Sequence, residues 1–287
     1  MPNDNTSVYE RISNDYYSLT ASEKKVADYV LANQQGTQFL SISELAEACE
    51  VAEATVSRFC RRLGYRGYNL FKLAVANAST KHKPWSNPLS GEVEETDSLE
   101  DISKKLYGAE LEALNQTLEL LDLHAVKEAA DLLESAKRVL CMGQGGSMII
   151  ATEACHLFST VSNKFMAISD SHLQAMAAAS ADPEDVILFF SYSGSTKAMM
   201  HTLKQADSRH VHTVLVTRFP NSPGADFADV VLQCGSNQNP LQSGSVPARI
   251  AQLYLLDVLF SELTRRNIQA CREFRTRIAD ALAEEHL

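Results

Sequence analysis

Four arginines lie within nine residues of this chain, in the stretch ATVSRFCRRLGYRG at 54–67, which holds no acidic residue. A guanidinium group presents several N–H donors in one plane, which suits phosphate oxygens and the hydrogen-bonding edges of bases. The whole chain carries a formal net charge of −10, so its composition does not explain this local excess of positive charge. The pattern indicates either a contact with nucleic acid or a cationic helix face that is merely hydrated.

On a helix with 100° per residue, positions 53–63 separate into two sides. Val56, Phe59, Cys60 and Leu63 share one side, which gives the helix an apolar stripe for a core. The other side holds small, hydroxyl-bearing and cationic residues: Ala54, Ser57, Arg58, Arg61 and Arg62, with Thr55 at its edge. Small residues at a helix start allow close approach to a DNA groove, and arginines on the next turns reach base edges or phosphates.

The preceding residues give this helix the spacing of a helix-turn-helix motif. Residues 41–44 form a capping box that starts a short helix, as residues 20–23 do earlier in the chain. Ala46 falls at the close contact between the two helices of such a motif, and Val56 and Phe59, ten and thirteen positions later, complete the small core. We therefore predict a DNA-binding domain whose recognition helix carries the arginines.

Two positions depart from that motif. Glu50 stands where the turn commonly has a glycine with positive φ, a conformation that costs a glutamate about 1 kcal/mol. Ala52 stands where a serine would cap the second helix. The predicted DNA contacts lie on the exposed side of the helix and in the loop and helix that follow, where cations contact phosphates: Thr55, Ser57, Arg58, Arg61, Arg62, Arg66 and Lys72.

Two turns rich in glycine and hydroxyl groups offer a second chemistry. MGQGGS at 142–147 and SYSGST at 191–196 each follow an apolar run typical of a strand, and each precedes a helical pattern. Backbone amides at a helix start attract anions, glycine lets a phosphate come close, and serine and threonine donate hydrogen bonds. Two such turns at the carboxyl ends of strands suit a phosphorylated small ligand.

Other interpretations of these turns are weaker. A dinucleotide-binding GxGxxG would need glycine at position 148, where the chain has Met148, and the sequence contains no GK[ST] phosphate loop. Asp170, at the end of the next predicted strand, keeps a nicotinamide ligand open as an alternative. The hydroxyl groups also suit ordinary N-caps, an explanation that fits one turn more easily than both.

The two groups of residues lie in regions of different periodicity. Residues 7–76 follow a helical period. In the second part, two long helical stretches precede five short β-branched or apolar runs: 139–143, 164–169, 185–191, 212–217 and 229–234. Helical segments separate the first four runs, which predicts a parallel sheet. The predicted fold class is an all-α helix-turn-helix domain followed by an α/β domain with a parallel sheet flanked by helices on both faces.

Composition places the domain boundaries. We predict a DNA-binding domain at 1–80, a linker rich in Pro, Ser, Gly and charge at 81–98, a ligand-binding domain with leading helices at 99–267, and a C-terminal helix at 268–287. Residues 1–83 hold ten Lys and Arg against nine Asp and Glu, a net +1, whereas the remainder holds sixteen against twenty-seven, a net −11. The second part is therefore no general polyanion binder.

Composition also excludes several classes of protein. No apolar run approaches the roughly 18 residues needed to cross a bilayer, and MPNDNTSVYE lacks the basic and apolar parts of a signal peptide. The six cysteines form no CxxC pair and are expected to be reduced core residues. We expect a cytoplasmic protein that has no membrane partner and no metal or other cofactor.

The stretch LTASEKKVADYVL…SISELAEACEVAEATVSRFCRRLGYRGYNLFKLAV resembles the N-terminal domain of the RpiR family of bacterial transcriptional regulators, over nearly all of residues 7–76. GQGGS, SYSGST and ARIAQLYLLDVLF resemble landmarks of the sugar isomerase (SIS) domain, over roughly 137–266. A helix-turn-helix followed by SIS is the arrangement of that family. The resemblance implies that the two turns bind the phosphate of a phosphosugar.

The predicted effector site combines the two turns with residues of two neighbouring segments: Gly143, Gly145, Ser147, Ser191, Ser193, Thr196, His172 and Arg249. The resemblance implies that LQSGSVPARIAQL lies beside the ligand. Arg249 in that segment is a candidate ion-pair partner for the ligand, or it fixes a helix. His172 follows the second predicted strand and is a candidate ligand contact.

Some SIS domains are aldose–ketose isomerases, so an enzyme with a regulatory DNA-binding domain remains the alternative. Isomerisation needs a base, and the candidates are Glu153, His156, His172 and His201. A DNA-binding domain favours a regulator, because a plain isomerase has no need of one. We therefore expect a sequence-specific regulator of sugar metabolism, without catalytic residues, which binds an operator in double-stranded DNA under the control of a phosphosugar. We expect it to act as a homodimer or homotetramer.

Overall fold

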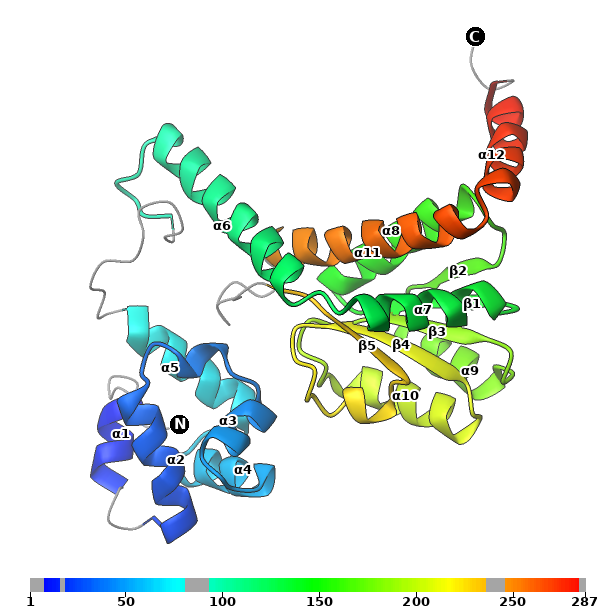
Figure 1. Ribbon diagram of the computed structural model, residues 1–287. Coiled ribbons are helices and arrows are strands. Elements are labelled where there is room, and N and C mark those ends of the chain that lie inside the picture. Colours follow the sequence, from blue (N-terminus) through cyan, green and yellow to red (C-terminus); the bar gives the residue numbers. More distant parts are fainter. Residues whose placement is uncertain (1–7, 16–18, 81–92, 236–245, 284–287) are drawn as a thin grey trace. The chain divides into compact units, whose positions relative to one another are not determined.

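The computed structural model describes residues 8–15, 19–80, 93–235 and 246–283 (Figure 1). These residues divide into two compact units, and the division falls inside one helix, between Ala109 and Glu110. Most of the predicted linker lies outside the described residues, so the predicted domain boundaries stay a prediction. Within the described ranges, every helix is too short or too polar to cross a membrane.

The first unit consists of short helices around one apolar core. Its elements are α1 (Val8–Asp15), α2 (Ala21–Ala32), the 3-10 turn η2 (Thr37–Phe39), α3 (Ile42–Ala48), α4 (Glu53–Arg62) and α5 (Tyr68–Thr80). Val26, Leu45, Val56, Phe59 and Phe71 are fully buried in this core. The rings of Phe59 and Phe71 meet edge to face, with their centroids 5.6 Å apart. The apolar stripe predicted for the arginine-bearing helix is thereby confirmed.

Both predicted capping boxes are present. The Glu23 amide donates to the Thr20 hydroxyl at 3.4 Å, and the Thr20 amide donates to the Glu23 carboxylate at 2.9 Å. Ser41 and Glu44 make the same exchange at 3.1 and 2.8 Å. These bonds satisfy amides at the starts of α2 and α3 that have no acceptor inside their own helix.

The corner between α3 and α4 depends on Glu50, which adopts a left-handed conformation with φ of 50°. Its amide donates to the carbonyl of Glu47, and the amide of Val51 donates to that of Ala46, both at 2.9 Å. These are the two bonds of a Schellman motif, which ends a helix at a residue with positive φ. The positive φ expected at this position is confirmed. Ala52 then starts α4 without a side-chain cap.

The second unit is built on a five-stranded parallel sheet with the order β2-β1-β3-β4-β5. Its strands are β1 (Val139–Gly143), β2 (Phe165–Ile168), β3 (Val186–Phe190), β4 (His212–Thr217) and β5 (Val230–Gln233). Every residue of β1 and β3 is buried, because helices cover both faces of the sheet. The five predicted strands and the predicted fold class are confirmed.

Helices form a layer on each face of the sheet (Figure 1). One layer contains α7 (Leu123–Ser135), α8 (Gly146–Ser159) and α11 (Val246–Arg266), and the other contains α9 (Ser171–Ser180) and α10 (Lys197–Ser208). Successive strand residues point into opposite layers, so Cys141 belongs to the first core and Met142 to the second. The two remaining helices are α6 (Leu99–Glu119) and α12 (Ile268–Ala283).

The strand order reverses at β1 and β3. The chain leaves β1 toward β2 on one side and returns to β3 on the other, so the pair forms a topological switch point. Gly143 pairs with Phe190 at the last rung of the two strands. The turns at 144–146 and 191–196 therefore leave the same edge of the sheet from neighbouring strands, which lie about 4.8 Å apart. Open α/β sheets bind their ligands at this position.

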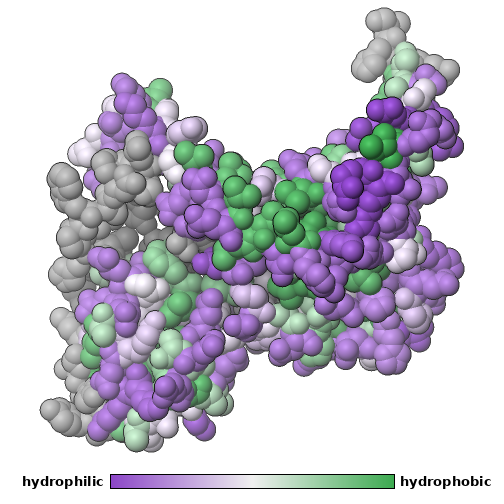
Figure 2. Space-filling model, viewed as in Figure 1, coloured by the Kyte–Doolittle hydropathy of each residue, from purple (hydrophilic) through white to green (hydrophobic). Residues whose placement is uncertain are grey.

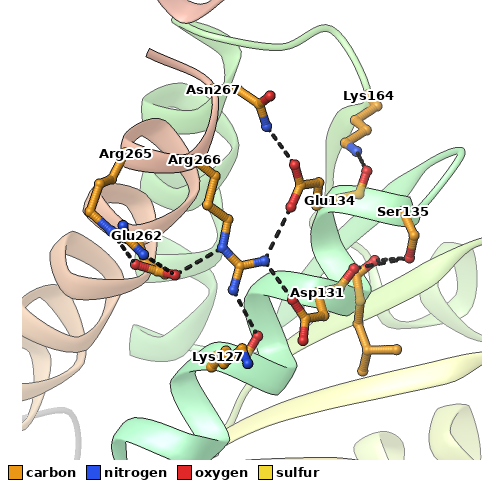
Figure 3. Close-up of polar contacts among 10 residues, drawn as sticks. Lys127, Asp131, Glu134, Ser135, Lys164, Glu262, Arg265, Arg266 and Asn267 are labelled. Carbon is orange, nitrogen blue, oxygen red and sulfur yellow. Dashed lines mark hydrogen bonds and ion pairs between the residues drawn. The ribbon is translucent and has the colours of Figure 1, made fainter.

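Arg266 anchors the last turn of α11 on α7 (Figure 3). Its guanidinium lies 2.6 Å from the carboxylate of Asp131, 3.1 Å from that of Glu134 and 2.8 Å from that of Glu262. Only 15% of the Arg266 side chain is exposed, so water screens these ion pairs weakly. The neighbouring Arg265 is 70% exposed and pairs with Glu262 at 2.9 Å.

We expect Arg266→Met to lower the free energy of unfolding by about 1–3 kcal/mol, because it leaves Asp131 and Glu134 without their cation and Glu262 with Arg265 alone. Arg265→Met is the matched control and should change it by less than about 0.5 kcal/mol, because an exposed pair contributes little. Urea unfolding followed by circular dichroism measures both variants. Equal losses from the two substitutions would show that Arg266 does not anchor the helix.

Candidate nucleic-acid interface and ligand-binding turns

The outer side of α4 and the turn after it carry a group of exposed cations. Arg58, Arg61 and Arg66 are exposed, and Ser57 is half-buried beside them. The guanidinium groups of Arg61 and Arg66 have no ion-pair partner among the residues that the structure describes. These four residues therefore offer N–H and O–H donors to an external acceptor, as the sequence predicts.

Thr55 lies on the buried side of α4, with 6% of its surface exposed. Its hydroxyl accepts a hydrogen bond from Nη2 of Arg58 at 3.1 Å. Thr55 therefore contacts a predicted DNA-binding residue and does not itself belong to the exposed face. The helical wheel places Thr55 at the edge of that face. At such an edge, a small rotation of the helix about its axis decides whether the side chain is buried or exposed.

Arg62 pairs with a buried carboxylate of its own unit. Its Nε lies 3.4 Å from Oε1 of Glu23, whose side chain is only 5% exposed. Burial raises the pKa of Glu23, but hydrogen bonds from Thr20 and the positive charges of Arg62 and Arg58 outweigh it, so the pKa lies below its ordinary value. Glu23 thus stays ionised at neutral pH and takes up much of the charge of Arg62.

Lys72, on α5, is half-buried. Burial lowers the pKa of its ammonium group to about 8, partly opposed by the negative charge of Glu44. Lys72 is thus less exposed than Arg61 and Arg66, and its predicted phosphate contact stays a prediction. The sequence pattern identifies the cation but not the direction of its long side chain.

The first glycine turn joins β1 to α8. A Cβ atom at Gly143 would lie 2.6 Å from the backbone oxygen of Ser147, so only glycine allows the first turn of α8 to come this close to the strand. Gly145 starts α8 with no side-chain cap. Ser147 is half-buried, and its hydroxyl has no hydrogen-bond partner among the described residues.

The second turn joins β3 to α10 and is braced by the loop after β4. The Gly194 amide donates to the hydroxyl of Ser191 at 3.2 Å, and the Gly224 amide donates to the carbonyl of Gly194 at 2.9 Å. Gly194 has a φ of 57°, and a Cβ atom there would lie 2.0 Å from the hydroxyl oxygen of Ser222. The hydroxyl of Thr217 donates to the carbonyl of Tyr192 at 3.2 Å. The turn is therefore held in one conformation.

The hydroxyl groups of these turns do not serve as N-caps. Thr196 occupies the N-cap position of α10 without a side-chain capping bond. Ser193 is half-buried, Thr196 is exposed, and neither hydroxyl has a partner within the described part of the chain. Ordinary capping, the alternative explanation for the serines and threonines, does not account for either turn. Uncapped helix starts with free hydroxyls suit an anionic group.

The remaining predicted effector residues flank the turns. His172 is exposed in the first turn of α9, where Asp170 caps the helix by accepting from the Leu173 amide at 2.9 Å. That cap uses Oδ1 of the Asp170 carboxylate. Arg249 lies in the first turn of α11, and its buried Nε has no hydrogen-bond partner among the residues that the structure describes. Residues 241–245 of the neighbouring segment lie outside the described residues.

Candidate bases for an isomerase lie on helix surfaces. Glu153 and His156 are exposed on α8, with Nδ1 of His156 3.9 Å from the Glu153 carboxylate. His201 is exposed on α10. Among the described residues, no group of three His, Cys, Asp or Glu side chains can hold a metal ion.

Gln174 is a site residue that the sequence interpretation missed. It is fully buried on α9, and its amide nitrogen donates to the carbonyls of Gly143 at 2.8 Å and of Ile168 at 2.7 Å. It thus ties the end of β1, where the first turn begins, to the end of β2. A glutamine among the alanines of SHLQAMAAAS is the signal that could have identified it, since a buried amide needs partners.

Comparisons with known proteins bear on both units. Residues 6–82 match the sequence model of the helix-turn-helix domain, rpiR family, and residues 132–262 match that of the SIS domain. An HTH-type transcriptional regulator of Haemophilus influenzae is 32% identical over 281 residues, which are 98% of each chain. The HTH-type transcriptional regulator HexR of Escherichia coli is 29% identical over 275 residues, 96% of this chain and 94% of HexR.

A solved structure resembles the whole chain. The Vibrio vulnificus NanR protein complexed with ManNAc-6P matches it with a TM-score of 0.87 and 25% sequence identity. The match covers 98% of this chain and 99% of that chain. The likeness therefore extends over both units and not over one domain alone.

The substitution Lys72→Met tests whether Lys72 is enclosed by the protein or contacts a DNA phosphate. The pKa of Lys72 is about 8 in the folded chain and 10.5 ordinarily, so between pH 8 and pH 10.5 the unfolded chain binds more protons than the folded chain. The free energy of unfolding therefore rises with pH over this range. We expect Lys72→Met to raise the free energy of unfolding at pH 7 by about 1–3 kcal/mol. This gain should shrink as the pH rises past 8.

Urea unfolding at pH 7 and pH 9.5 measures the effect, with Lys25→Met on the exposed side of α2 as the control. If Lys72→Met instead lowers affinity for DNA and reduces its salt dependence by about one phosphate contact, the lysine reaches the DNA backbone as the sequence predicts.

Proposed function

Because the chain belongs to the RpiR family of helix-turn-helix transcriptional regulators with a SIS domain, we propose that it binds an operator in double-stranded DNA and that a phosphorylated sugar controls this binding. The observation that carries the proposal is the pair of uncapped, hydroxyl-bearing turns at the switch point of the second unit. We place the protein in the cytoplasm, together with its DNA, and assign it no catalytic role.

The proposed DNA contacts are Ser57, Arg58, Arg61 and Arg66. The three arginines are exposed and Ser57 is half-buried, on and after α4, the second helix of the motif, which enters the major groove in helix-turn-helix proteins. Thr55 and Arg62 contribute indirectly, because the first is buried and the second pairs with Glu23.

The proposed effector contacts are the amides at the starts of α8 and α10 and the hydroxyls of Ser147, Ser193 and Thr196. A phosphate group is an acceptor of hydrogen bonds, and these three hydroxyls are donors without partners in the described structure. Ser191 shapes the second turn from within. We assign His172 and Arg249 to the part of the sugar that lies beyond the phosphate. The bound ManNAc-6P of the similar NanR structure supports the class of ligand.

A regulator of this kind acts through a symmetric oligomer. Figure 2 shows apolar side chains gathered over α11 in the second unit, and Leu118, Leu123 and Val246 are exposed on the elements there. A groove between α7 and α11 is lined by Leu123, Tyr254 and Val258, among others. We propose that this face binds a second copy of the chain, as a homodimer or as part of a homotetramer. Two recognition helices would then meet half-sites about 34 Å apart or a multiple of it.

The effector acts by linkage. If the phosphosugar favours one arrangement of the oligomer, it changes the match between the two recognition helices and the half-sites. Coupling of this kind typically changes affinity by about 5- to 150-fold. The operator affinity and the effector affinity must then change by the same factor.

We expect Arg58→Gln and Arg61→Gln each to weaken binding to a duplex selected by the wild-type protein from a random library, by about 1–3 kcal/mol. Lys25→Gln, which removes one positive charge from α2 in the same unit, is the control and should have little effect. Fluorescence anisotropy measures the affinities. Unchanged affinity in both arginine variants would exclude this face.

We expect Ser193→Ala combined with Thr196→Ala to abolish the effector response while ligand-free DNA binding stays intact. A thermal-shift screen of hexose phosphates and N-acetylhexosamine phosphates supplies the effector, and its influence on DNA affinity is then measured for wild type and variant. Ser208→Ala, at the other end of α10, is the control. A normal response in the double variant would exclude these turns.

Sedimentation equilibrium of the same samples reports the oligomer, and a monomer would contradict the dimer.

A further inference from the structure

We propose that Thr55 determines the sequence specificity of the chain by holding Arg58 in one orientation on the recognition helix. The proposal rests on the DNA-binding function proposed above. Thr55 would act through Arg58, without touching DNA itself, and is therefore a positioning residue.

The contact joins a buried acceptor to an exposed donor. Thr55 is 6% exposed and lies next to Val56, which is fully buried in the core, so packing fixes its position. Nη2 of Arg58 donates to this oxygen at 3.1 Å. Because side chains on a helix point toward its N-terminus, the bond holds the guanidinium over the first turn of α4. The N-terminal residues of a recognition helix are those that contact base edges.

The bond leaves Arg58 able to bind a base. A guanidinium group has five N–H donors, and Thr55 uses one of them. The remaining donors are enough for the two parallel hydrogen bonds that arginine makes to O6 and N7 of guanine. An arginine that is ordered before binding loses less side-chain entropy on contact, which favours the one base that matches its fixed position.

Two carboxylates of the first unit, those of Glu23 and Glu53, are occupied by other partners. Oε2 of Glu23 accepts from the amide and hydroxyl of Thr20, while its Oε1 faces Arg62. Glu53, in the first turn of α4, accepts a hydrogen bond from the hydroxyl of Ser43 on α3. Thr55, a neutral acceptor, therefore orients Arg58 without neutralising its charge.

The arginines of α4 and the following turn thus differ in their constraints. Arg58 is oriented by a hydroxyl, Arg62 is paired with a buried carboxylate, and Arg61 and Arg66 have no ion-pair partner in the described structure. We expect discrimination between sequences to depend on Arg58, and affinity for any sequence to depend on Arg61 and Arg66. A phosphate contact needs no fixed orientation, whereas the recognition of a base does.

The test compares Thr55→Val with Thr55→Ser. Valine keeps the shape of threonine but lacks the hydroxyl, and serine keeps the hydroxyl. The measured quantity is the ratio of affinities for the duplex selected by the wild-type protein and for a scrambled duplex of the same composition. We expect Thr55→Val to reduce this ratio about three- to tenfold, as the loss of one hydrogen bond predicts, and Thr55→Ser to restore it. The salt dependence of binding should stay unchanged, because no phosphate contact is lost.

Two controls separate positioning from folding. Thr37→Val removes another buried hydroxyl of the same unit, which donates to the carbonyl of Asn33, and should leave the ratio unchanged. In a background of Arg58→Gln, Thr55→Val should have no further effect on the ratio, because the side chain through which it acts is gone. Circular dichroism confirms that each variant is folded, and Thr55→Ala replaces Thr55→Val if the valine variant does not fold.

Three outcomes would overturn the proposal: an unchanged ratio in Thr55→Val, an equal loss in Thr55→Ser, or a loss that persists in the Arg58→Gln background. Failure of the DNA-binding function itself gives a different result. In that case the wild-type protein selects no sequence from the random library, and the ratio equals one before any substitution.

Discussion

The parallel pairing of β1 with β3 is the constraint on which the sensing half of this protein depends. Its register sets Gly143 beside Phe190 at the end of both strands, so the two turns that follow leave the sheet as neighbours. The helices that follow the two turns, α8 after β1 and α10 after β3, pack on opposite faces of the sheet, which leaves the edge between the turns free of crossover helices. The hydroxyls and amides of the turns act together only because of this register.

In the first unit, the corresponding constraint is the corner between α3 and α4. The Schellman motif at Glu50 and the burial of Val56 and Phe59 fix which side of α4 meets the core and which side meets solvent. The exposed side then carries arginines in three different states: oriented by a hydroxyl, paired with a carboxylate, or without an ion-pair partner in the described structure. The number of arginines on a helix is therefore larger than the number of guanidinium groups that are available to bind phosphates.

Periodicity predicted the elements well, because burial imposes it on neighbouring residues: the strands at 139–143 and 212–217 and the helix at 246–266 lie where their patterns place them. Turn chemistry was equally readable, since both capping boxes and the positive φ at Glu50 are local. Contacts between distant residues were not. Nothing in the order of residues links Glu23 to Arg62 or Gln174 to Gly143, because the tertiary fold alone brings these pairs together.

The most direct measurement of the central claim is a crystal structure of the chain grown with the sugar phosphate that raises its melting temperature most. The account predicts phosphate oxygens within hydrogen-bonding distance of the Ser193 and Thr196 hydroxyls and of the amides that start α8 and α10. A sugar phosphate bound elsewhere on the chain, with both turns empty, would contradict it.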